Sequence, residues 1–291
     1  MGTSPSLVII ITGCSSGFGL LASARLSAAG HRVHACVRDL KKCEALHAET
    51  ASRGGSSKLS IHVMNVADPV SIKAAVAEVI SCEGVIDVLI NNAGFGIGGF
   101  FEDLSDEDWR QQFDTNFFGV LNVTREVLPF MRRHRSGRII NISSLSAFSG
   151  MPAFSAYVSS KWALEGFSES LNMELKPFGI DVLLVEPGSY RTKIFSDNAR
   201  YAKNFNNQNS PYYAMSVGLQ SFVNKYLRRS HRSPEEVAIV LEALATKKHV
   251  RFRNIIGVVS RLRYWVVRHI PFEFYAWIVN RILSWGNQRH A

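Results

Sequence analysis

Short apolar runs recur along the first two-thirds of the chain and alternate with longer segments of helical periodicity. The runs are rich in β-branched residues and cover 7–11, 33–37, 59–63, 85–90, 138–142 and 182–185. Where a run is apolar throughout, it indicates a strand that helices cover on both faces. Helical periodicity covers 19–29, 70–80, 109–131 and 157–175. This order predicts an α/β fold with a doubly wound parallel sheet and helices on both faces.

The excess of basic residues lies at the C-terminal end of the chain. Residues 225–291 hold 13 of the 33 Lys and Arg residues but 4 of the 24 Asp and Glu residues, so they account for the whole formal net charge of +9. The preceding 224 residues are neutral overall. A DNA-binding surface on the main domain is therefore disfavoured, and we expect no nucleic-acid partner.

The cysteines and the N-terminus favour a reducing, cytoplasmic location. The four cysteines have neither disulfide-framework nor metal-ligand spacing, so we expect no bound metal. No basic leader precedes the first apolar run, and no uncharged apolar stretch reaches membrane-spanning length. Gly2 in MGTSPS matches the loose N-myristoylation pattern, a short pattern that often occurs by chance.

A glycine-rich segment, TGCSSGFG (12–19), follows the first apolar run directly. Gly13, Gly17 and Gly19 would let the backbone turn tightly and approach a phosphate, and the helix that follows presents the positive end of its dipole. The spacing is TGxxxGxG and differs from the common GxGxxG fingerprint. A tight turn without a ligand is the alternative. The strand before and the helix after favour a dinucleotide site.

Three residues much further along the chain complete the predicted site. Tyr157 and Lys161 stand four residues apart, so on a helix their side chains share one face. Ser144 ends the preceding strand, at the sheet edge where open α/β proteins bind ligands. A neighbouring ammonium favours the phenolate and lowers the pKa of a tyrosine, which makes Tyr157 a candidate general acid and base. Ser144 would hold the substrate oxygen, although alone it would suggest a strand-end cap.

Together these motifs resemble one known family, the short-chain dehydrogenase/reductases, over roughly residues 7–195. The resemblance implies a single Rossmann-type domain with a seven-stranded parallel sheet, and hydride transfer between a nicotinamide cofactor and a carbonyl or alcohol. The matching motifs stand in the family's order: TGCSSGFG, NNAG (91–94), Asn116 in DTNFFG, Ser144, Tyr157, Lys161 and PGSYRT (187–192).

The resemblance also implies roles for individual residues. Ser144, Tyr157, Lys161 and Asn116 would form a catalytic tetrad, with Asn116 anchoring a proton-relay water. The residues expected at the cofactor are Gly13, Ser15, Gly17, Phe18, Gly19, Arg38, Asn65, Val66, Asn92, Ala93, Gly94, Tyr157, Lys161, Pro187, Gly188 and Thr192.

The end of the second strand favours NADP(H) over NAD(H). An acid at this place binds the adenosine ribose diol, whereas a cation accommodates a 2′-phosphate. The position at which NAD-preferring members carry the acid corresponds to Val37, and Arg38 follows it. Asp39 and the lack of a basic residue at Ser16 point the other way. We therefore expect NADP(H), with NAD(H) as the alternative.

Aromatic residues around the predicted site indicate a bulky apolar substrate. Phrases such as CSSGFGL and SKWALEGFSESL look closest to the retinol and hydroxysteroid dehydrogenase branch, which implies a steroid-, retinoid- or lipid-like alcohol or ketone. One alternative is the same chemistry on a polar or carrier-bound acyl substrate. Another is a non-catalytic dinucleotide-binding module. The residues expected to line an apolar substrate pocket are Phe95, Phe148, Met151, Phe154 and Phe195.

The last part of the chain differs in composition from the rest. We predict a catalytic domain over 1–257, with a substrate loop at about 192–232, and a basic, aromatic helical extension over 258–291 that Pro271 divides into two short helices. Three interpretations of the extension compete. It packs on the domain or on a partner subunit, it lies peripherally in a membrane interface, or it contacts nucleic acid, which is the weakest of the three. We expect a homo-oligomer.

Overall fold

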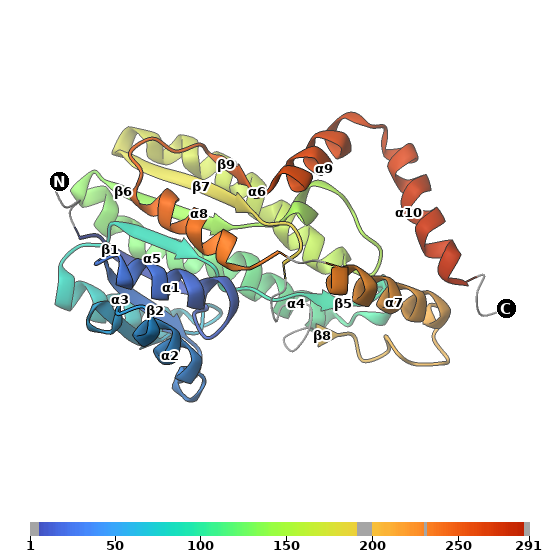
Figure 1. Ribbon diagram of the computed structural model, residues 1–291, viewed down its shortest axis with the longest axis horizontal. Helices are drawn as coiled ribbons and strands as arrows, with labels where there is room; N and C mark the ends of the chain where they lie inside the picture. The colour runs from blue at the N-terminus through green and yellow to red at the C-terminus, as the bar shows by residue number, and fades with distance from the viewer. Residues whose placement is uncertain (1–5, 191–199, 230–231, 288–291) are drawn as a thin grey trace.

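Seven parallel strands form the central sheet of the protein. The computed structural model describes residues 6–190, 200–229 and 232–287 of the 291-residue chain. Along the sheet the strands lie in the order β3-β2-β1-β4-β6-β7-β9 (Figure 1), and neighbouring strands pair in parallel. In chain order these strands are β1 (Val8–Thr12), β2 (Arg32–Val37), β3 (Leu59–Val63), β4 (Val88–Asn91), β6 (Gly137–Ile142), β7 (Ile180–Glu186) and β9 (Arg253–Ile255).

Helices cover both faces of this sheet, which explains why the central strands β1 and β4 are buried along their whole length. Alternate residues of β1 belong to different cores: Ile9 and Ile11 pack on one face of the sheet, Val8 and Ile10 on the other. Helices α1 (Gly17–Ala28), α2 (Glu44–Ser52) and α8 (Glu235–Thr246) contribute to the first core. The second core contains residues of α3 (Pro69–Glu83), α5 (Gly119–His134) and α6 (Ser155–Leu175). The predicted doubly wound fold is therefore confirmed.

The single helix predicted over 109–131 is wrong in detail. A capping box at Ser105 starts α4 (Asp106–Phe113) earlier, a π-helical turn follows over Asp114–Phe118, and α5 then continues to His134. A π turn widens the helix by one residue. Asn116 lies on this turn with no exposed surface, so the widened turn is the element that places its amide.

A third apolar cluster lies beyond the carboxyl ends of the strands. It joins the two-stranded sheet of β5 (Ile97–Gly98) and β8 (Arg200–Tyr201) to the start of α6 and to α7 (Tyr213–Arg229). The sequence predicted a substrate loop at about 192–232, whereas the described part of this stretch contains β8 and the long helix α7. It missed α2, in which Leu46 and Thr50 are the buried residues, and β9, whose three residues are too few to show a pattern.

The chain ends in an arm of two helices, α9 (Val258–His269) and α10 (Phe272–Asn287), which extends away from the sheet (Figure 1). Pro271 separates them, and the predicted C-terminal helical extension is confirmed. Within the described residues no helix is both long and apolar enough to span a membrane. The division of the chain at residues 257 and 258 stays a prediction, and Gly2 lies outside the described residues.

Candidate active site

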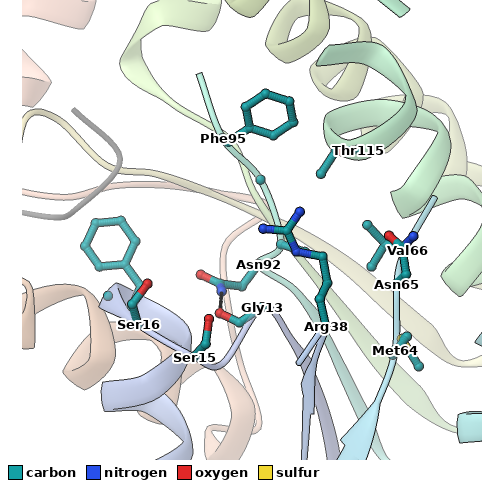
Figure 2. Close-up of a pocket in the computed structure, with 14 residues that line it drawn as sticks. Gly13, Ser15, Ser16, Arg38, Met64, Asn65, Val66, Asn92, Phe95 and Thr115 are labelled. Atoms are coloured by element: carbon teal, nitrogen blue, oxygen red, sulfur yellow. Dashed lines mark hydrogen bonds between the residues drawn. The ribbon is translucent and has the colours of Figure 1, made fainter. Parts of the chain in front are cut away.

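A cleft runs along the carboxyl ends of the central strands, and its wall contains most of the predicted cofactor residues. Its first part is lined by Gly13, Ser15, Ser16, Gly17, Phe18, Arg38, Met64, Asn65, Val66, Asn92, Ala93, Gly94, Phe95 and Thr115 (Figure 2). Its second part is lined by Phe18, Asn92, Gly94, Phe95, Ile142, Ser143, Ser144, Tyr157, Lys161, Pro187, Gly188 and Tyr190. Four residues line both parts, so the two parts adjoin each other.

Backbone geometry at the glycine loop requires glycine at Gly13 and Gly17. Gly13 and Gly17 have φ angles of 72° and 61°, in the left-handed region that favours glycine. A Cβ atom at Gly13 would lie 2.8 Å from the Cα of Ala93. The side chain of Ser16, the N-cap of α1, makes no capping hydrogen bond. The first-turn N–H groups of α1, which have no acceptors within the helix, can therefore bind an anion.

Thr12 holds the glycine loop against the loop after β4. Its Oγ1 accepts hydrogen bonds from the backbone N–H groups of Asn92 (3.0 Å) and Ala93 (2.9 Å). The Asn92 side chain in turn donates to the carbonyl oxygens of Thr12 (2.8 Å) and Gly13 (3.0 Å). The two loops thus form one rigid wall. The sequence placed Thr12 in the motif but did not single it out.

The charges along the cleft favour an anionic ligand. Among the described residues that line it, Arg38 and Lys161 carry charge and no carboxylate occurs. Figure 2 shows the Arg38 side chain reaching into the space of the first part. Asp39, the nearby acid that favoured NAD(H), caps a short helix, and its Oδ1 accepts from the N–H of Lys41 at 3.0 Å. Val37 is buried in the core.

The second part of the cleft brings Ser144, Tyr157 and Lys161 together, as the sequence predicted. Tyr157 and Lys161 lie near the start of α6 and are buried, with exposed fractions of 6% and 7%. Ser144 follows β6, and its Oγ accepts from the N–H of Ser146 at 3.1 Å. The Lys161 ammonium donates to the carbonyl oxygen of Ile142 at 2.7 Å. The Ser144 hydroxyl and the Lys161 ammonium are thus both held on the cleft wall.

Burial controls the pKa values of this pair. It raises the pKa of Tyr157 above its usual value, and the side-chain hydrogen bond with Ser144 lowers it in part. Burial also lowers the pKa of Lys161 to about 8, while the negative charge of Glu165 raises it. The sequence led us to expect the ammonium to lower the pKa of Tyr157, whereas in this structure burial raises that pKa and Ser144 is the group that lowers it. Tyr157 is therefore protonated at neutral pH.

Asn116 supports the cleft from behind. Its Oδ1 accepts from the Phe95 N–H at 3.1 Å, and its Nδ2 donates to the Phe95 carbonyl oxygen at 2.9 Å. Nδ2 also lies 3.3 Å from the Oγ of Ser160, which donates to the carbonyl oxygen of Tyr157. Asn116 thus connects the loop after β4 to the helical turn that carries Tyr157.

A cluster of three acids around one arginine, two of the acids buried, lies next to Lys161 on α6, and the sequence gave no sign of it. The Arg253 guanidinium on β9 forms ion pairs with Glu165 and Glu169 of α6, and with Glu186 of β7 at 3.1 Å. Glu186 has no exposed surface, and burial raises its pKa to about 8. Charge spacing in the sequence could not reveal this cluster, because Arg253 lies far along the chain from its partners.

The predicted substrate residues are only partly at the cleft. Phe95 lines both of its parts, and Arg200 stacks on that ring with 4.7 Å between guanidinium carbon and ring centroid. Phe154 is buried in the third apolar cluster, Met151 packs against that cluster, and Phe148 contacts Tyr264 of α9. Phe195 and Thr192 lie outside the described residues. Sequence reasoning missed several residues that line the cleft: Ser16, Met64, Thr115, Ile142, Ser143 and Tyr190.

Comparison with known proteins gives a consistent result. The family model for short chain dehydrogenase matches residues 7–202. An uncharacterised oxidoreductase of Bacillus subtilis is 45% identical over 244 residues, which are 84% of this chain and 86% of that protein. A 3-ketodihydrosphingosine reductase of Bacteroides thetaiotaomicron is 38% identical over 250 residues, 86% of this chain and 87% of the other.

A solved structure and one further sequence relative agree with these matches. A short-chain dehydrogenase from Streptomyces avermitilis is 31% identical, with a TM-score of 0.77 over 90% of this chain and 92% of that one. Human retinol dehydrogenase 8 is 41% identical over 197 residues, 66% of this chain and 61% of that protein. From the sheet order, the glycine loop, the convergence of Ser144, Tyr157 and Lys161, and these matches, the chain belongs to the short-chain dehydrogenase/reductase family of NAD(P)-dependent oxidoreductases.

Proposed function

We propose that the protein is an NADP(H)-dependent oxidoreductase that transfers a hydride between the nicotinamide and a carbonyl or alcohol carbon of a bulky apolar substrate. The observation that carries this proposal is the single cleft with a glycine loop at one end and Ser144, Tyr157 and Lys161 at the other. A dinucleotide is long enough to require both ends of such a cleft.

Each residue of the second part has a proposed role. The Ser144 hydroxyl binds the substrate oxygen, and Tyr157 passes a proton to that oxygen during reduction or takes it during oxidation. Lys161 keeps a positive charge close to Tyr157, and Asn116 fixes the turn below it. The cofactor supplies or accepts the hydride. Because Tyr157 is protonated at neutral pH, it is ready for the reductive direction.

The remaining cleft residues fit a dinucleotide phosphate. Gly13 packs so closely on the Ala93 backbone that only glycine fits there, and the open helix N-terminus of α1 suits a pyrophosphate. Arg38 suits the 2′-phosphate of NADP(H), because no acid lines the described part of the cleft to repel that phosphate. Solved relatives of this family hold NADP in one case and NAD in another. The proposed preference of this chain for NADP(H) therefore rests on Arg38 and on Asp39, whose carboxylate caps a short helix. Pro187 and Gly188 line the nicotinamide end in this proposal.

Two features support an apolar substrate. Phe95 faces the reacting end of the cleft, and the third apolar cluster stands beside it. In addition, two relatives carry the names of lipid-like substrates, 3-ketodihydrosphingosine and retinol. One observation favours the alternative of a carrier-bound acyl substrate: Arg200, which does not itself line the cleft, stacks on Phe95 and so places a cation next to a ring that does.

A Tyr157→Phe variant tests the proposal. We expect loss of turnover by a factor on the order of 10² to 10⁴, the range for removal of a general acid, with NADPH binding retained. Turnover is measured with NADPH on a panel of long-chain ketones, steroid ketones and retinal, together with acetoacetyl thioesters. Tyr201→Phe removes a phenol oxygen outside the cleft and serves as the control, with turnover like that of the wild type.

The panel also separates the alternatives. Turnover of the thioesters without turnover of the lipophilic carbonyls would replace the apolar substrate with a carrier-bound acyl group. If wild type and Tyr157→Phe were equally inactive on every substrate while both bound NADPH, the proposed catalytic role of Tyr157 would be wrong. This outcome would favour a dinucleotide-binding module.

We further propose a cytoplasmic homo-oligomer, on the evidence of the sequence. Light scattering coupled to size-exclusion chromatography tests the oligomeric state, and a monomer at micromolar concentration would contradict it. Fractionation of the native cells tests the location: the chain should be recovered with the cytoplasm or with the cytoplasmic side of a membrane.

A further inference from the structure

The outer face of the C-terminal arm is apolar, which is the reverse of a helix that packs on a domain. Among the described residues, eight of the seventeen large apolar side chains with high exposure fall between 258 and 277. Those on α9 follow helical spacing and form one stripe. The eight residues, named the arm patch below, are Val258, Val259, Leu262, Trp265, Val266, Phe272, Phe274 and Trp277.

The inner face of the arm explains why this stripe remains exposed. Ser260 of α9 is buried beside Gly188, and the Tyr264 ring meets that of Phe148 at a centroid distance of 4.6 Å. Tyr275 of α10 donates its hydroxyl hydrogen to the carbonyl oxygen of Gly150 at 2.9 Å. The arm is therefore fixed to the body by its inner side, and its apolar side faces solvent.

Arginines surround the arm patch. Arg261, Arg263 and Arg268 lie on the flanks of the α9 stripe, and Arg281 of α10 covers the Trp277 ring with 5.4 Å between guanidinium carbon and ring centroid. Glu273 is the one acid between residues 258 and 281. A helix with exposed aliphatic and aromatic side chains next to cationic ones is typical of a segment that lies in the interface of an anionic membrane.

We propose that the arm patch docks the protein on an anionic lipid bilayer, with α9 and the start of α10 lying in the headgroup region. The apolar side chains of the patch enter the acyl boundary, and the arginines on its flanks bind lipid phosphates. Attachment is peripheral, because no described helix has the length and hydropathy of a span.

The docked arm lies next to the candidate active site. Its inner side contacts the segment that connects Ser144 to Tyr157, through Phe148 and Gly150, and Ser260 lies against Gly188 of the cleft wall. A membrane at the arm patch would therefore lie near the substrate end of the cleft. This consequence rests on the proposed function, since it matters only for a lipid-like substrate.

A second copy of the chain is the other candidate for this surface. Self-association through a two-fold axis would bring two copies of the same arginine-flanked patch together, with the single acid Glu273 to offset them. Like charges face each other in that arrangement, whereas phosphate headgroups match the cations. Charge complementarity thus favours the lipid surface.

Co-sedimentation with vesicles of defined composition tests the docking. The full chain is mixed with phosphatidylcholine vesicles or with vesicles of phosphatidylcholine and phosphatidylglycerol, in low and high salt. We expect binding to the anionic vesicles at low salt, weaker binding at high salt, and weaker binding still to the neutral vesicles. A chain that stays in the supernatant with anionic vesicles at low salt overturns the proposal.

Matched variants locate the binding surface. Val259 and Val70 are 79% and 77% exposed, one on the arm patch and the other at the start of α3 on the main domain. Val259→Asp combined with Leu262→Asp should weaken binding to anionic vesicles by at least about tenfold, whereas Val70→Asp should leave it unchanged. Arg263→Gln should weaken it by about fivefold at low salt. Equal losses for the arm and control variants would contradict the proposal.

Two further measurements distinguish a misfolded variant, self-association of the arm patch and a wrong substrate class from failure of the docking proposal. NADPH binding by each variant shows that it is folded, and it is independent of vesicle binding. Light scattering without lipid tests the second copy: a dimer that Val259→Asp dissociates, together with no vesicle binding, assigns the patch to self-association and overturns the docking. Vesicle binding by a chain without turnover on any lipophilic carbonyl leaves the docking intact and contradicts the proposed substrate class.

Discussion

The two ends of the cleft differ in what forms their walls. At the glycine-loop end the wall is mainly backbone, held by Thr12 and shaped by glycines that leave no room for a Cβ atom. At the other end it consists of buried side chains with perturbed pKa values, Tyr157 and Lys161. A change at the first end should therefore alter folding and cofactor affinity, and a change at the second should alter turnover.

Among the variants that compare the two ends, Ser144→Ala gives the largest expected effect, and it acts at the side-chain end. The variant removes the hydroxyl proposed to bind the substrate oxygen, so kcat should fall by a factor on the order of 10² to 10³, as for loss of one oxyanion-type donor. The Kd for NADPH, measured by nicotinamide fluorescence, should change little. A variant that loses NADPH affinity as strongly as turnover would show that the two ends are not separate.

Gly19→Ala acts at the backbone end and should show the opposite pattern. The added Cβ atom would lie 2.6 Å from the carbonyl oxygen of Gly13, so the loop must shift. Overpacking of this kind costs about 1–3 kcal/mol. We expect a lower melting temperature and NADPH affinity reduced by up to about 100-fold, measured by thermal unfolding and fluorescence titration.

Gly166→Ala is the matched control for this variant. Gly166 is exposed on α6, with nothing within 4 Å of the position that a Cβ would take. Replacing a helical glycine with alanine should stabilise the protein by about 1 kcal/mol and leave NADPH affinity unchanged. If Gly19→Ala behaved like this control, the steric account of the glycine loop would be wrong.

The same contrast explains how much could be predicted from the sequence. The backbone end depends on local spacing, so TGCSSGFG and the strand before it were enough to place Gly13 and Gly17 on the cleft. Gly19 does not line the cleft and packs behind it, against Gly13 and Asn92. The convergence of Ser144, Tyr157 and Lys161 was predicted as well, since strand ends and helix periodicity bring them to one edge of the sheet. These features require only short-range patterns and the topology of a parallel sheet.

Features made by distant side chains could not be predicted in this way. Arg253 meets Glu165 and Glu186 only because β9 pairs with β7 and α6 packs over both. The raised pKa of Tyr157 also has no signature in the spacing YxxxK, because it depends on how deeply the ring is buried. The π-helical turn at Asn116 was missed for a related reason: a one-residue widening hardly changes the hydrophobic period.

Arg38→Ala has a smaller expected effect and tests the charge in the backbone end of the cleft. Loss of a charged hydrogen bond to the 2′-phosphate should weaken NADPH binding by about 10- to 100-fold and leave NADH binding nearly unchanged. Fluorescence titration with both cofactors measures this difference. Tighter binding of NADH than of NADPH by the wild type, unaffected by the variant, would replace NADP(H) with NAD(H) in the proposed function.

Glu165→Gln is expected to give the smallest effect, at the side-chain end. The negative charge of Glu165 raises the pKa of Lys161, which burial has lowered to about 8. Without that charge the pKa of Lys161 falls further, so the ammonium form is lost at a lower pH. The alkaline limb of the kcat profile should therefore move to lower pH, with a several-fold loss of activity near pH 8 and little change near pH 6.

Glu169→Gln is the matched control, because Glu165 and Glu169 both lie on α6 and both pair with Arg253. The side chain of Glu169 is 52% exposed and that of Glu165 is 8% exposed, and the pKa of Lys161 responds to the buried one. The control should keep the pH profile of the wild type, since solvent screens its charge. Equal shifts in both variants would mean that the Arg253 cluster acts on Lys161 as a whole through its structure. A shift confined to Glu165→Gln would show that the chemistry of the side-chain end is set by one buried charge beneath it.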